Sequence, residues 1–343
     1  MLQAEWAPYR LFFRFEARTS RQVMTYKDTY FVRVSDSDTP SRIAIGECAL
    51  FRGLSADDRP DYEELLSQAC SNPEQALNSP CSSIRFGFET ALGLHGSAAS
   101  DWQRGLCGIP INGLVWMGDK ATMRARIKEK LDSGFRVLKL KIGGIAFDDE
   151  VDLLREVRRA FSPDDLEVRL DANGAFTPEN ALTRLDTLAQ FHIHSLEQPV
   201  KAGQTEAMAR ICAESPIPIA LDEELIGLRT PEESEQLLSD IRPAYIILKP
   251  SLCGGFKASG TYIDAARKLG IGWWATSALE SDIGLAAIGS WLSSGFNIDM
   301  PQGLGTGQLY TNNIPSPLHM AAGALHYDPA ASWGNVDFLP WRR

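Results

Sequence analysis

The sequence predicts an α/β fold: a TIM-like (β/α) barrel preceded by a small α+β capping domain. Three observations carry this prediction. Apolar strands and amphipathic helices alternate from residue 109 onward, the ends of successive strands are almost evenly spaced, and the first hundred residues follow a different pattern. The chain of 343 residues has room for both parts, because such a barrel needs about 250 residues.

The first part of the chain has the period of two that is typical of antiparallel strands. Leu11, Phe13 and Phe15 alternate with charged residues, and the stretch 30–34 repeats this pattern. Segment 18–27 between them is polar, so we expect it to be a loop that closes as a lid over a bound ligand.

Domain boundaries follow from the change of pattern. Helices are expected near 62–70 and 82–94, and both belong with the antiparallel strands. We therefore assign residues 1–105 to the capping domain and residues 106–324 to the barrel. The tail, 325–343, is expected to pack back on the capping domain.

The barrel itself is predicted from a repeating unit of one strand and one helix. Some helix starts are distinct, such as the capping box at Thr230 with Pro231 after it. Five successive strands end 25 to 28 residues apart, at Asp171, Glu197, Asp222, Lys249 and Ser277. Seven strands are predicted in all, with an eighth near 297–300. A doubly wound open sheet is the alternative, and the even spacing favours the closed barrel.

Composition indicates a protein that acts on small molecules. The net charge of −10 disfavours nucleic acid and anionic membranes as partners, because both attract clustered Lys and Arg. The six cysteines lack metal-ligand spacing and are interpreted as reduced thiols. No signal peptide or membrane-spanning run is recognised, so a cytoplasmic location is expected, whereas the oligomeric state is not indicated.

Carboxylates end three neighbouring strands of the predicted barrel. Asp171, Glu197 and Asp222 would meet at its mouth, where the C-terminal strand ends converge. Any one of them alone could be a helix cap or a solvated charge, but three matching positions favour a shared role. Three such carboxylates repel one another unless a cation neutralises them. Because all the ligands are oxygens, we predict Mg²⁺, with Mn²⁺ as the alternative.

Lysines are predicted on two sides of this carboxylate cluster. Lys139 and Lys141 are two residues apart on one strand, so both side chains point inward. Partial desolvation beside a second cation allows one of them to lose its proton and act as a base. Lys249 lies four strands further on and would face them. A substrate is therefore predicted between Lys141 and Lys249, with the metal to one side.

In combination these motifs resemble the enolase superfamily, in its muconate-lactonizing-enzyme-like branch with lysines on the second and sixth barrel strands. The motifs are Lys139-Leu140-Lys141, Asp171-Ala172-Asn173-Gly174, Glu197-Gln198-Pro199, Asp222-Glu223 and Lys249-Pro250. The resemblance spans nearly the whole chain. It implies that a base removes a proton next to a carboxylate and that the metal stabilises the resulting enediolate.

Within that branch the chain is most similar to the o-succinylbenzoate synthases. The motifs are Pro110-Ile111-Asn112-Gly113, Lys249-Pro250-Ser251-Leu252, Ser277-Ala278-Leu279-Glu280-Ser281 and Gly303-Leu304-Gly305-Thr306. The resemblance implies a dehydratase of menaquinone biosynthesis whose substrate is a small dicarboxylate. Lys141 would remove the α-proton and then protonate the departing hydroxyl from the same face. Lys249 would stay cationic and stabilise the enediolate.

The resemblance also implies supporting residues and substrate contacts. Lys139, Asn173 and Glu223 are expected to support the metal ligands and the base, with Glu223 beside the metal site rather than as a fourth ligand. Contacts with substrate are expected from Arg169, Ser251, Ser277 and Glu280. For the two serines, a hydrogen bond to the local backbone is an equally good interpretation.

Other activities of the superfamily are alternatives. N-succinylamino acid racemases use the same lysines and ligands, so the residues alone do not separate them from dehydratases. Dipeptide epimerases usually carry an Asp-x-Asp pair near the eighth strand, where this chain has Asp299-Met300-Pro301. Mandelate-racemase-like enzymes use a His base, and no His occurs between His194 and His319. A binding barrel without activity would be expected to lose part of the set, and every member is present.

Overall fold

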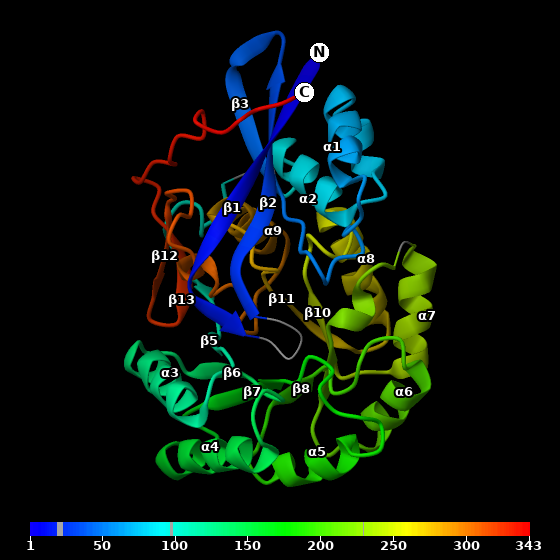
Figure 1. The fold of residues 1–343 in the computed structure, drawn as a ribbon, viewed down its shortest axis with the longest axis vertical. Helices are drawn as coiled ribbons and strands as arrows, with labels where there is room; N and C mark the ends of the chain where they lie inside the picture. Colours follow the sequence, from blue (N-terminus) through cyan, green and yellow to red (C-terminus); the bar gives the residue numbers. More distant parts are fainter. Residues whose placement is uncertain (19–22, 97–98, 229) are drawn as a thin grey trace.

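A computed structural model describes residues 1–18, 23–96, 99–228 and 230–343, and shows an antiparallel sheet above a curled parallel sheet (Figure 1). The predicted fold class, a TIM-like barrel with an α+β cap, is therefore confirmed. Within these ranges, no helix is both long and apolar enough to cross a membrane.

The capping sheet has the order β1-β2-β3 and is covered by two helices and a short 3₁₀ turn (Figure 1). Its elements are β1 (Leu2–Arg18), β2 (Val23–Asp36), β3 (Thr39–Cys48), α1 (Tyr62–Ser71), η1 (Gln75–Asn78) and α2 (Ser82–Ala91). Alternate residues of the strands pack against the helices, as in the cluster of Trp6, Val32, Leu66 and Phe88. The two predicted helices are thus confirmed.

The loop predicted at 18–27 is mostly strand. Residues 23–27 pair with β1 in the register Arg18↔Val23 to Leu11↔Lys27. Met24 and Lys27 are buried while Val23 and Tyr26 are exposed, so a strand with one solvated face accounts for the polar composition. Residues 19–22, the rest of the segment predicted to be a lid, lie outside the described residues, so its closure over a ligand stays a prediction.

Seven parallel strands form the barrel sheet, in the order β11-β10-β9-β8-β7-β6-β5. They are β5 (Gly113–Val115), β6 (Val137–Lys141), β7 (Glu167–Asp171), β8 (Ser195–Glu197), β9 (Ile219–Leu221), β10 (Tyr245–Leu248) and β11 (Gly272–Ala275). Helices lie on the outside of this sheet (Figure 1). They are α3 (Lys120–Asp132), α4 (Phe147–Ala160), α5 (Ala181–Ala189), α6 (Thr205–Glu214), α7 (Pro231–Ile241), α8 (Gly255–Lys268) and α9 (Asp282–Gly295).

Barrel closure differs from the prediction. In the described part of the chain no strand forms at 297–300, and two parallel bridges close the gap instead, Ile111↔Gln302 and Thr276↔Gly303. The backbone N–H of Gln302 donates to the carbonyl of Pro110 at 2.8 Å. Pro301 has no N–H to donate to a ladder, so pairing starts only after it. The bridges nevertheless join the two edges of the sheet, which favours a closed barrel over an open doubly wound sheet.

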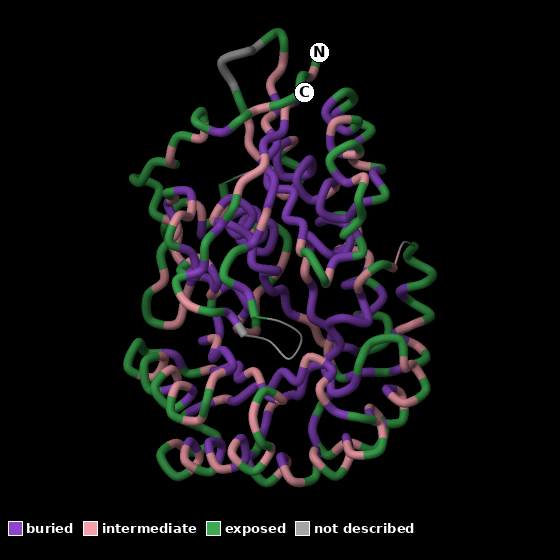
Figure 2. Tube along the Cα trace, viewed as in Figure 1, coloured by how far each residue is buried: buried purple, intermediate pink, exposed green. Residues whose placement is uncertain are grey.

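Most barrel strand residues are buried, whereas the helices expose their outer faces (Figure 2). The strands are therefore largely apolar, and a polar residue is noticeable where each one ends. The predicted capping box starts α7: the Thr230 side chain accepts a hydrogen bond from the N–H of Glu233, whose carboxylate accepts one from the N–H of Thr230.

The C-terminal segment returns to both parts of the molecule. The hairpin of β12 (Leu318–Ala321) and β13 (Ala324–Tyr327) pairs with β4 (Ile109–Pro110), at the start of the barrel. Further on, Trp6 and Arg342 exchange two backbone hydrogen bonds of 2.8 Å each, which places the two termini close together (Figure 1). Arg342, near the end of the tail, thus contacts the capping sheet, whereas the domain boundaries and the packing of the tail as a whole stay predictions.

Candidate active site

The ends of five neighbouring strands bring the predicted site residues together. Lys141, Asp171 and Glu197 are the last residues of β6, β7 and β8, and the pairing places Lys141 beside Asp171 and Asp171 beside Glu197. Asp222 and Lys249 directly follow β9 and β10. Because parallel strands align their C-terminal ends, one edge of the sheet carries the whole set.

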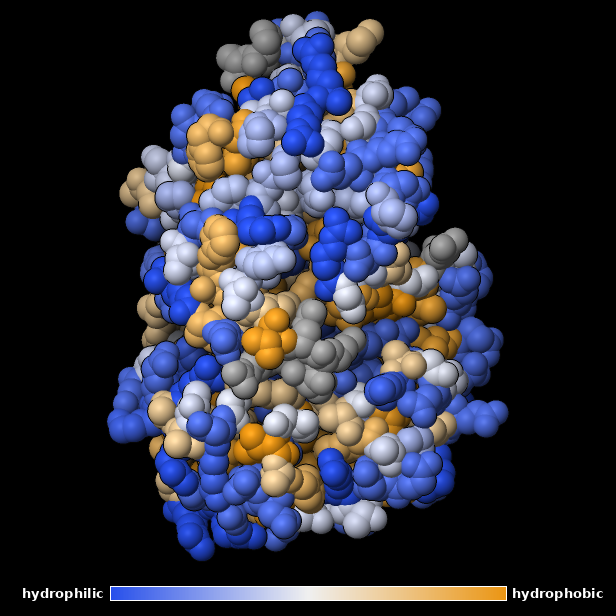
Figure 3. Space-filling view, in the orientation of Figure 1, coloured by the Kyte–Doolittle hydropathy of each residue, from blue (hydrophilic) through white to orange (hydrophobic). Residues whose placement is uncertain are grey.

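A cleft of about 810 Å³, partly open to solvent, lies over this edge. The capping domain contributes Met24, Phe51, Gly53 and Leu54 to its wall, and the barrel contributes the polar floor with Lys139, Lys141, Asp171, Asn173, Glu223 and Lys249. Hydrophobic side chains also gather on the surface where the β1–β2 hairpin meets the barrel (Figure 3). The cleft therefore offers a charged floor under largely apolar walls, which suits a compact molecule with a carboxylate.

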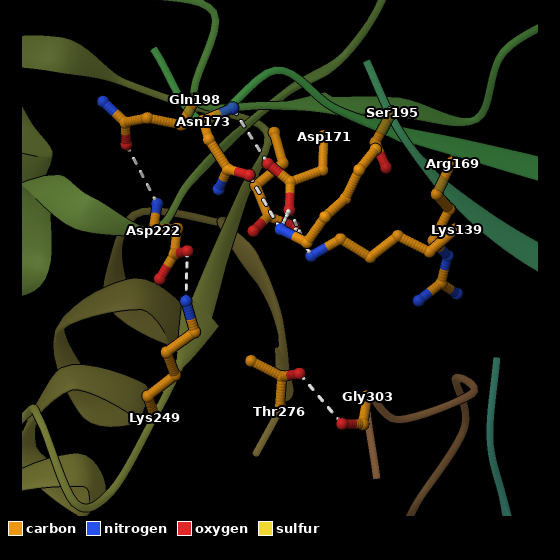
Figure 4. Close-up of polar contacts among 12 residues, drawn as sticks. Lys139, Arg169, Asp171, Asn173, Ser195, Gln198, Asp222, Lys249, Thr276 and Gly303 are labelled. Atoms are coloured by element: carbon orange, nitrogen blue, oxygen red, sulfur yellow. Dashed lines mark hydrogen bonds and ion pairs between the residues drawn. The ribbon is translucent and has the colours of Figure 1, made fainter. Parts of the chain in front are cut away.

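Lysine ammonium groups bridge the carboxylates (Figure 4). Lys139 Nζ lies 3.0 Å from Asp171 Oδ2 and 2.5 Å from Glu197 Oε2, and Lys141 Nζ lies 2.9 Å from Asp171 Oδ2. Lys249 Nζ contacts the carboxylate of Asp222. All of these side chains are almost completely buried, so each charge depends on its partner.

The lysines on the two sides of the cleft differ in proton affinity. Burial lowers the pKa of Lys141, and the positive charge of Lys139 adds to this effect against the opposing influence of Asp171. Burial acts on Lys249 in the same direction, but the carboxylates of Asp222 and Glu197 outweigh it and raise the pKa of Lys249. Lys141 is therefore the better base, and Lys249 is the lysine that stays charged.

The carboxylate cluster differs in one respect from the sequence prediction. In the described ranges, no three Asp, Glu, His or Cys side chains form a ready metal site, and Lys139 lies between Asp171 and Glu197 instead. The carboxylates are thus bridged by ammonium groups rather than gathered around one point. The cause is electrostatic, since buried carboxylates recruit the nearest available cations.

Glu197 nevertheless indicates that the cluster fits a further cation. Its Oε1 is buried and has no hydrogen-bond partner among the described residues. Burial, and then the negative charge of Asp171, raises the pKa of Glu197 to about 8. The site therefore lacks positive charge at this carboxylate. Because the donors of Asp171, Glu197 and Asp222 are all oxygens, they fit a hard divalent ion.

Asn173 connects the base to a further acid. Its Oδ1 accepts a hydrogen bond of 2.7 Å from Lys141 Nζ, and its Nδ2 donates to Glu223 Oε1 at 3.2 Å. Asn173 has a positive φ of 45°, a conformation that Asn tolerates better than most residues. Both residues lie where the prediction of a supporting role requires them.

Arg169 lies in the barrel interior but does not line the cleft. Its guanidinium donates to Glu167 Oε1 at 2.7 Å, toward the N-terminal end of β7, and to the carbonyl of Pro301 at 2.8 Å. It also lies over the ring of Trp274, 4.6 Å from the centroid. This placement directs the guanidinium away from the mouth and does not support the predicted substrate contact.

Ser251, Ser277 and Glu280 form one buried network. Both hydroxyls donate to the Glu280 carboxylate at 2.5 Å, and Ser277 Oγ also accepts from the N–H of Leu279 at 3.0 Å. Of the three predicted contacts, only Ser277 lines the cleft. The network ties the loop after Lys249 to the end of β11, so Glu280 holds the mouth together from behind.

A second buried charge cluster joins the cap to the barrel mouth. Glu47 of β3 accepts hydrogen bonds from the backbone N–H groups of Ser281 and Gly284, at 2.9 and 3.1 Å, at the start of α9. Lys27 of β2 is buried, and its Nζ has no hydrogen-bond partner among the described residues. Burial lowers its pKa, against the opposing charges of Glu47 and Glu280. The capping domain is thus anchored by charge directly behind the cleft.

Four polar residues of the site were not predicted to have a role there, although three of them lie within the motifs that carry the family resemblance. The cleft is lined by Asn112, Trp116 and Thr306. The side-chain oxygen of Gln198 accepts a hydrogen bond of 3.2 Å from the backbone N–H of Asp222. Asn112 and Trp116 flank β5 and are four residues apart, so the alternation of residues along this extended stretch could have indicated that both face the same side as Leu114.

Comparison with known proteins gives this site a family. Residues 122–330 match the family model described as enolase C-terminal domain-like. The o-succinylbenzoate synthase of Desulfotalea psychrophila is 45% identical over 92% of this chain and 96% of that protein. The crystal structure of MenC from Desulfotalea psychrophila LSv54 is similar with a TM-score of 0.81 at 41% identity, covering 95% of this chain and 99% of that one.

A more distant relative has a different name. The N-succinyl-L-Arg/Lys racemase of Bacillus cereus is 27% identical over 64% of this chain and 56% of that protein. The family model covers more than half of the chain, and the synthase matches nearly all of it. The chain therefore belongs to the enolase superfamily, whose members are typically metal-dependent.

Proposed function

We propose that the chain is a Mg²⁺-dependent o-succinylbenzoate synthase, which converts 2-succinyl-6-hydroxy-2,4-cyclohexadiene-1-carboxylate to 2-succinylbenzoate in menaquinone biosynthesis. One observation carries the proposal. Lys141 and Lys249 line opposite sides of one cleft, and their pKa values are shifted in opposite directions. The extended similarity to a synthase supports the same conclusion.

The ion would be held by Asp171, Glu197 and Asp222. These residues place three buried carboxylates at the mouth of the barrel, and Glu197 lacks a sufficient counter-charge there. When bound, the ion supplies positive charge to the substrate carboxylate, where negative charge accumulates as the neighbouring carbon loses its proton.

Lys141 performs both proton transfers. Its neutral amine takes the proton from the carbon that bears the ring carboxylate, and the lowered pKa favours this neutral form. The resulting ammonium group then returns a proton to the hydroxyl on the adjacent carbon as the C–O bond breaks. Water leaves and the ring becomes aromatic. Both transfers occur on one face because a single side chain makes them, so the elimination is syn.

Lys249 has the complementary role. Its raised pKa keeps the ammonium group charged, and from across the cleft it stabilises the enediolate. Lys139, which contacts Asp171 and Glu197, keeps the pKa of Lys141 low through its own charge. Asn173 orients the Lys141 amine through the hydrogen bond of 2.7 Å.

N-succinylamino acid racemisation is the second candidate, because it needs a lysine on each face of the substrate. The similarity to the Bacillus cereus racemase favours it. The much greater similarity to the synthase, 45% identity over 92% of this chain against 27% over 64% for the racemase, favours dehydration.

A substrate panel separates the two activities. With Mg²⁺ present, we expect kcat/KM for dehydration of the cyclohexadiene to exceed that for racemisation of N-succinylamino acids by about 100-fold or more, because the site stabilises one transition state better. Dehydration is followed by the change in ultraviolet absorbance and racemisation by polarimetry, with dipeptides as a further control. Racemisation as efficient as dehydration would exclude a dedicated synthase.

A further inference from the structure

Three neutral side chains of the cleft carry polar atoms that no described residue satisfies. They are Oδ1 of Asn112, Nε1 of Trp116 and Oγ1 of Thr306, and each is buried without a hydrogen-bond partner among the described residues. The three residues are only 3 to 4% exposed and all line the cleft. Leaving such atoms unpaired costs free energy, so a cluster of them in one cavity indicates a ligand.

The three residues share one side of the mouth. Asn112, Leu114 and Trp116 alternate along β5 and its flanks, so they face the same way, and Leu114 pairs in register with Lys139 on β6. The Gly303–Thr306 loop lies next to this strand, because the N–H of Asn112 donates to the carbonyl of Gln302 at 3.0 Å. A Cβ at Gly305 would come within 3.2 Å of the Asn112 carbonyl, so the loop packs closely there.

This side lies away from the carboxylates. Asp171 and Glu197 end β7 and β8, and Asp222 directly follows β9, whereas the three unsatisfied groups belong to the residues that flank β5 and to the loop that closes the barrel. The Trp116 ring also lies 5.7 Å from Lys141 Nζ, next to the reacting position. A substrate whose ring carboxylate sits over the carboxylates therefore directs its remaining substituent toward Asn112, Trp116 and Thr306.

We infer that Trp116 and Thr306 donate hydrogen bonds to the oxygen-bearing side chain of the substrate, which is the succinyl chain if the proposed function holds. Among the described residues that line the cleft, the cations are Lys139, Lys141 and Lys249, which the carboxylate floor already engages. The side chain is thus held by an indole N–H and a hydroxyl, with Leu114 and Leu279 lining the cleft beside its methylene groups. Asn112 Oδ1 only accepts, so its partner would be a donor such as water and not a succinyl oxygen.

Neutral donors make this part of the site selective. A buried group that hydrogen-bonds a substrate oxygen discriminates against any ligand that lacks the oxygen, because the group is then left unpaired. Trp116 and Thr306 are accordingly specificity-determining, whereas the lysines and acids serve the chemistry at the ring carboxylate.

Product binding tests this inference without turnover. Calorimetry with Mg²⁺ present compares 2-succinylbenzoate with benzoate, which lacks the succinyl chain, for wild type, Trp116→Phe and Thr306→Val. These substitutions preserve most of the shape and remove one donor each. We expect the Kd of 2-succinylbenzoate to rise about 5- to 10-fold for each variant and that of benzoate to stay constant. Trp273→Phe is the matched control. Trp273 lies on β11 among other aromatic rings and does not line the cleft, so this variant should leave the Kd of both ligands unchanged.

Two results would overturn the assignment. Equal losses for both ligands would mean that the residues act only on the shape of the site, and unchanged binding of 2-succinylbenzoate would mean that they do not contact the side chain. If wild type bound benzoate but gained nothing from the succinyl chain, the inference would fail. Failure of the proposed function would appear separately, as absent dehydration by an enzyme that still shows the ligand difference.

Discussion

Replacing Lys141 by alanine is expected to lower kcat by about 1,000-fold or more. One side chain both removes the α-proton and protonates the leaving hydroxyl, and general acid–base catalysis at a single step contributes about 100- to 10,000-fold. The neighbouring Lys139 does not substitute, because its pKa is raised: Asp171 and Glu197 together outweigh the lowering effect of burial. Initial rates of dehydration under saturating substrate measure the effect.

Lys257→Ala provides the matched control for this prediction, since Lys257 is an exposed lysine of α8 and should leave the rate unchanged. Circular dichroism and Mg²⁺ titration should show that Lys141→Ala folds and keeps the ion, because Asp171 retains Lys139 as a partner. A variant that kept more than about a tenth of the wild-type kcat would defeat the role assigned to Lys141.

Glu47→Ala is expected to reduce the free energy of unfolding by about 3–5 kcal/mol, because several buried donors lose their acceptor at about 1–3 kcal/mol each. Glu47 is fully buried and accepts hydrogen bonds from Thr29, Ser281 and Gly284. Without it, these donors lose their acceptor and Lys27 keeps only Glu280 as a counter-charge. Urea unfolding followed by tryptophan fluorescence measures the loss.

Glu47→Gln is the control, because the amide oxygen can still accept from the start of α9. We expect it to lose less stability than Glu47→Ala, and the double variant Glu47→Ala with Lys27→Met to recover part of the loss by removing the isolated charge. A loss below about 1 kcal/mol for Glu47→Ala would show that the cluster does not anchor the cap.

Much of the catalytic floor could be predicted because it is a property of strand ends. In an α/β barrel the strands are apolar and buried, so the residue at which each one turns polar marks the mouth. Lys141, Asp171, Glu197, Asp222 and Lys249 all follow this rule, and the structure brings them together. The period of two also correctly predicted that the side chains of Lys139 and Lys141 point to the same side of the strand.

Other features depend on contacts that no local pattern encodes. Arg169 is on the correct face, but its long side chain is drawn to Glu167 and the Pro301 carbonyl, away from the cleft. The bridging position of Lys139 reflects the charges on two neighbouring strands. Barrel closure moved from 297–300 to Gln302 because Pro301 interrupts the ladder.

Buried polar groups that have no partner within the protein are the hardest features to predict from the sequence. Trp116 and Thr306 have ordinary neighbours in the sequence, and only the folded cleft shows that their polar atoms are buried without partners. The Glu47 and Lys27 cluster has the same origin, since it combines two strands of the cap with the start of α9.

Metal dependence tests the central claim most directly. Protein treated with a chelator and dialysed is titrated with Mg²⁺ by calorimetry, and dehydration is assayed in parallel, for wild type and Glu197→Gln. We expect one Mg²⁺ per chain, no turnover without the ion, recovery of turnover when the ion is returned, and clearly weaker Mg²⁺ binding by Glu197→Gln. Full activity in the chelated protein, or Mg²⁺ binding that Glu197→Gln leaves unchanged, would contradict it.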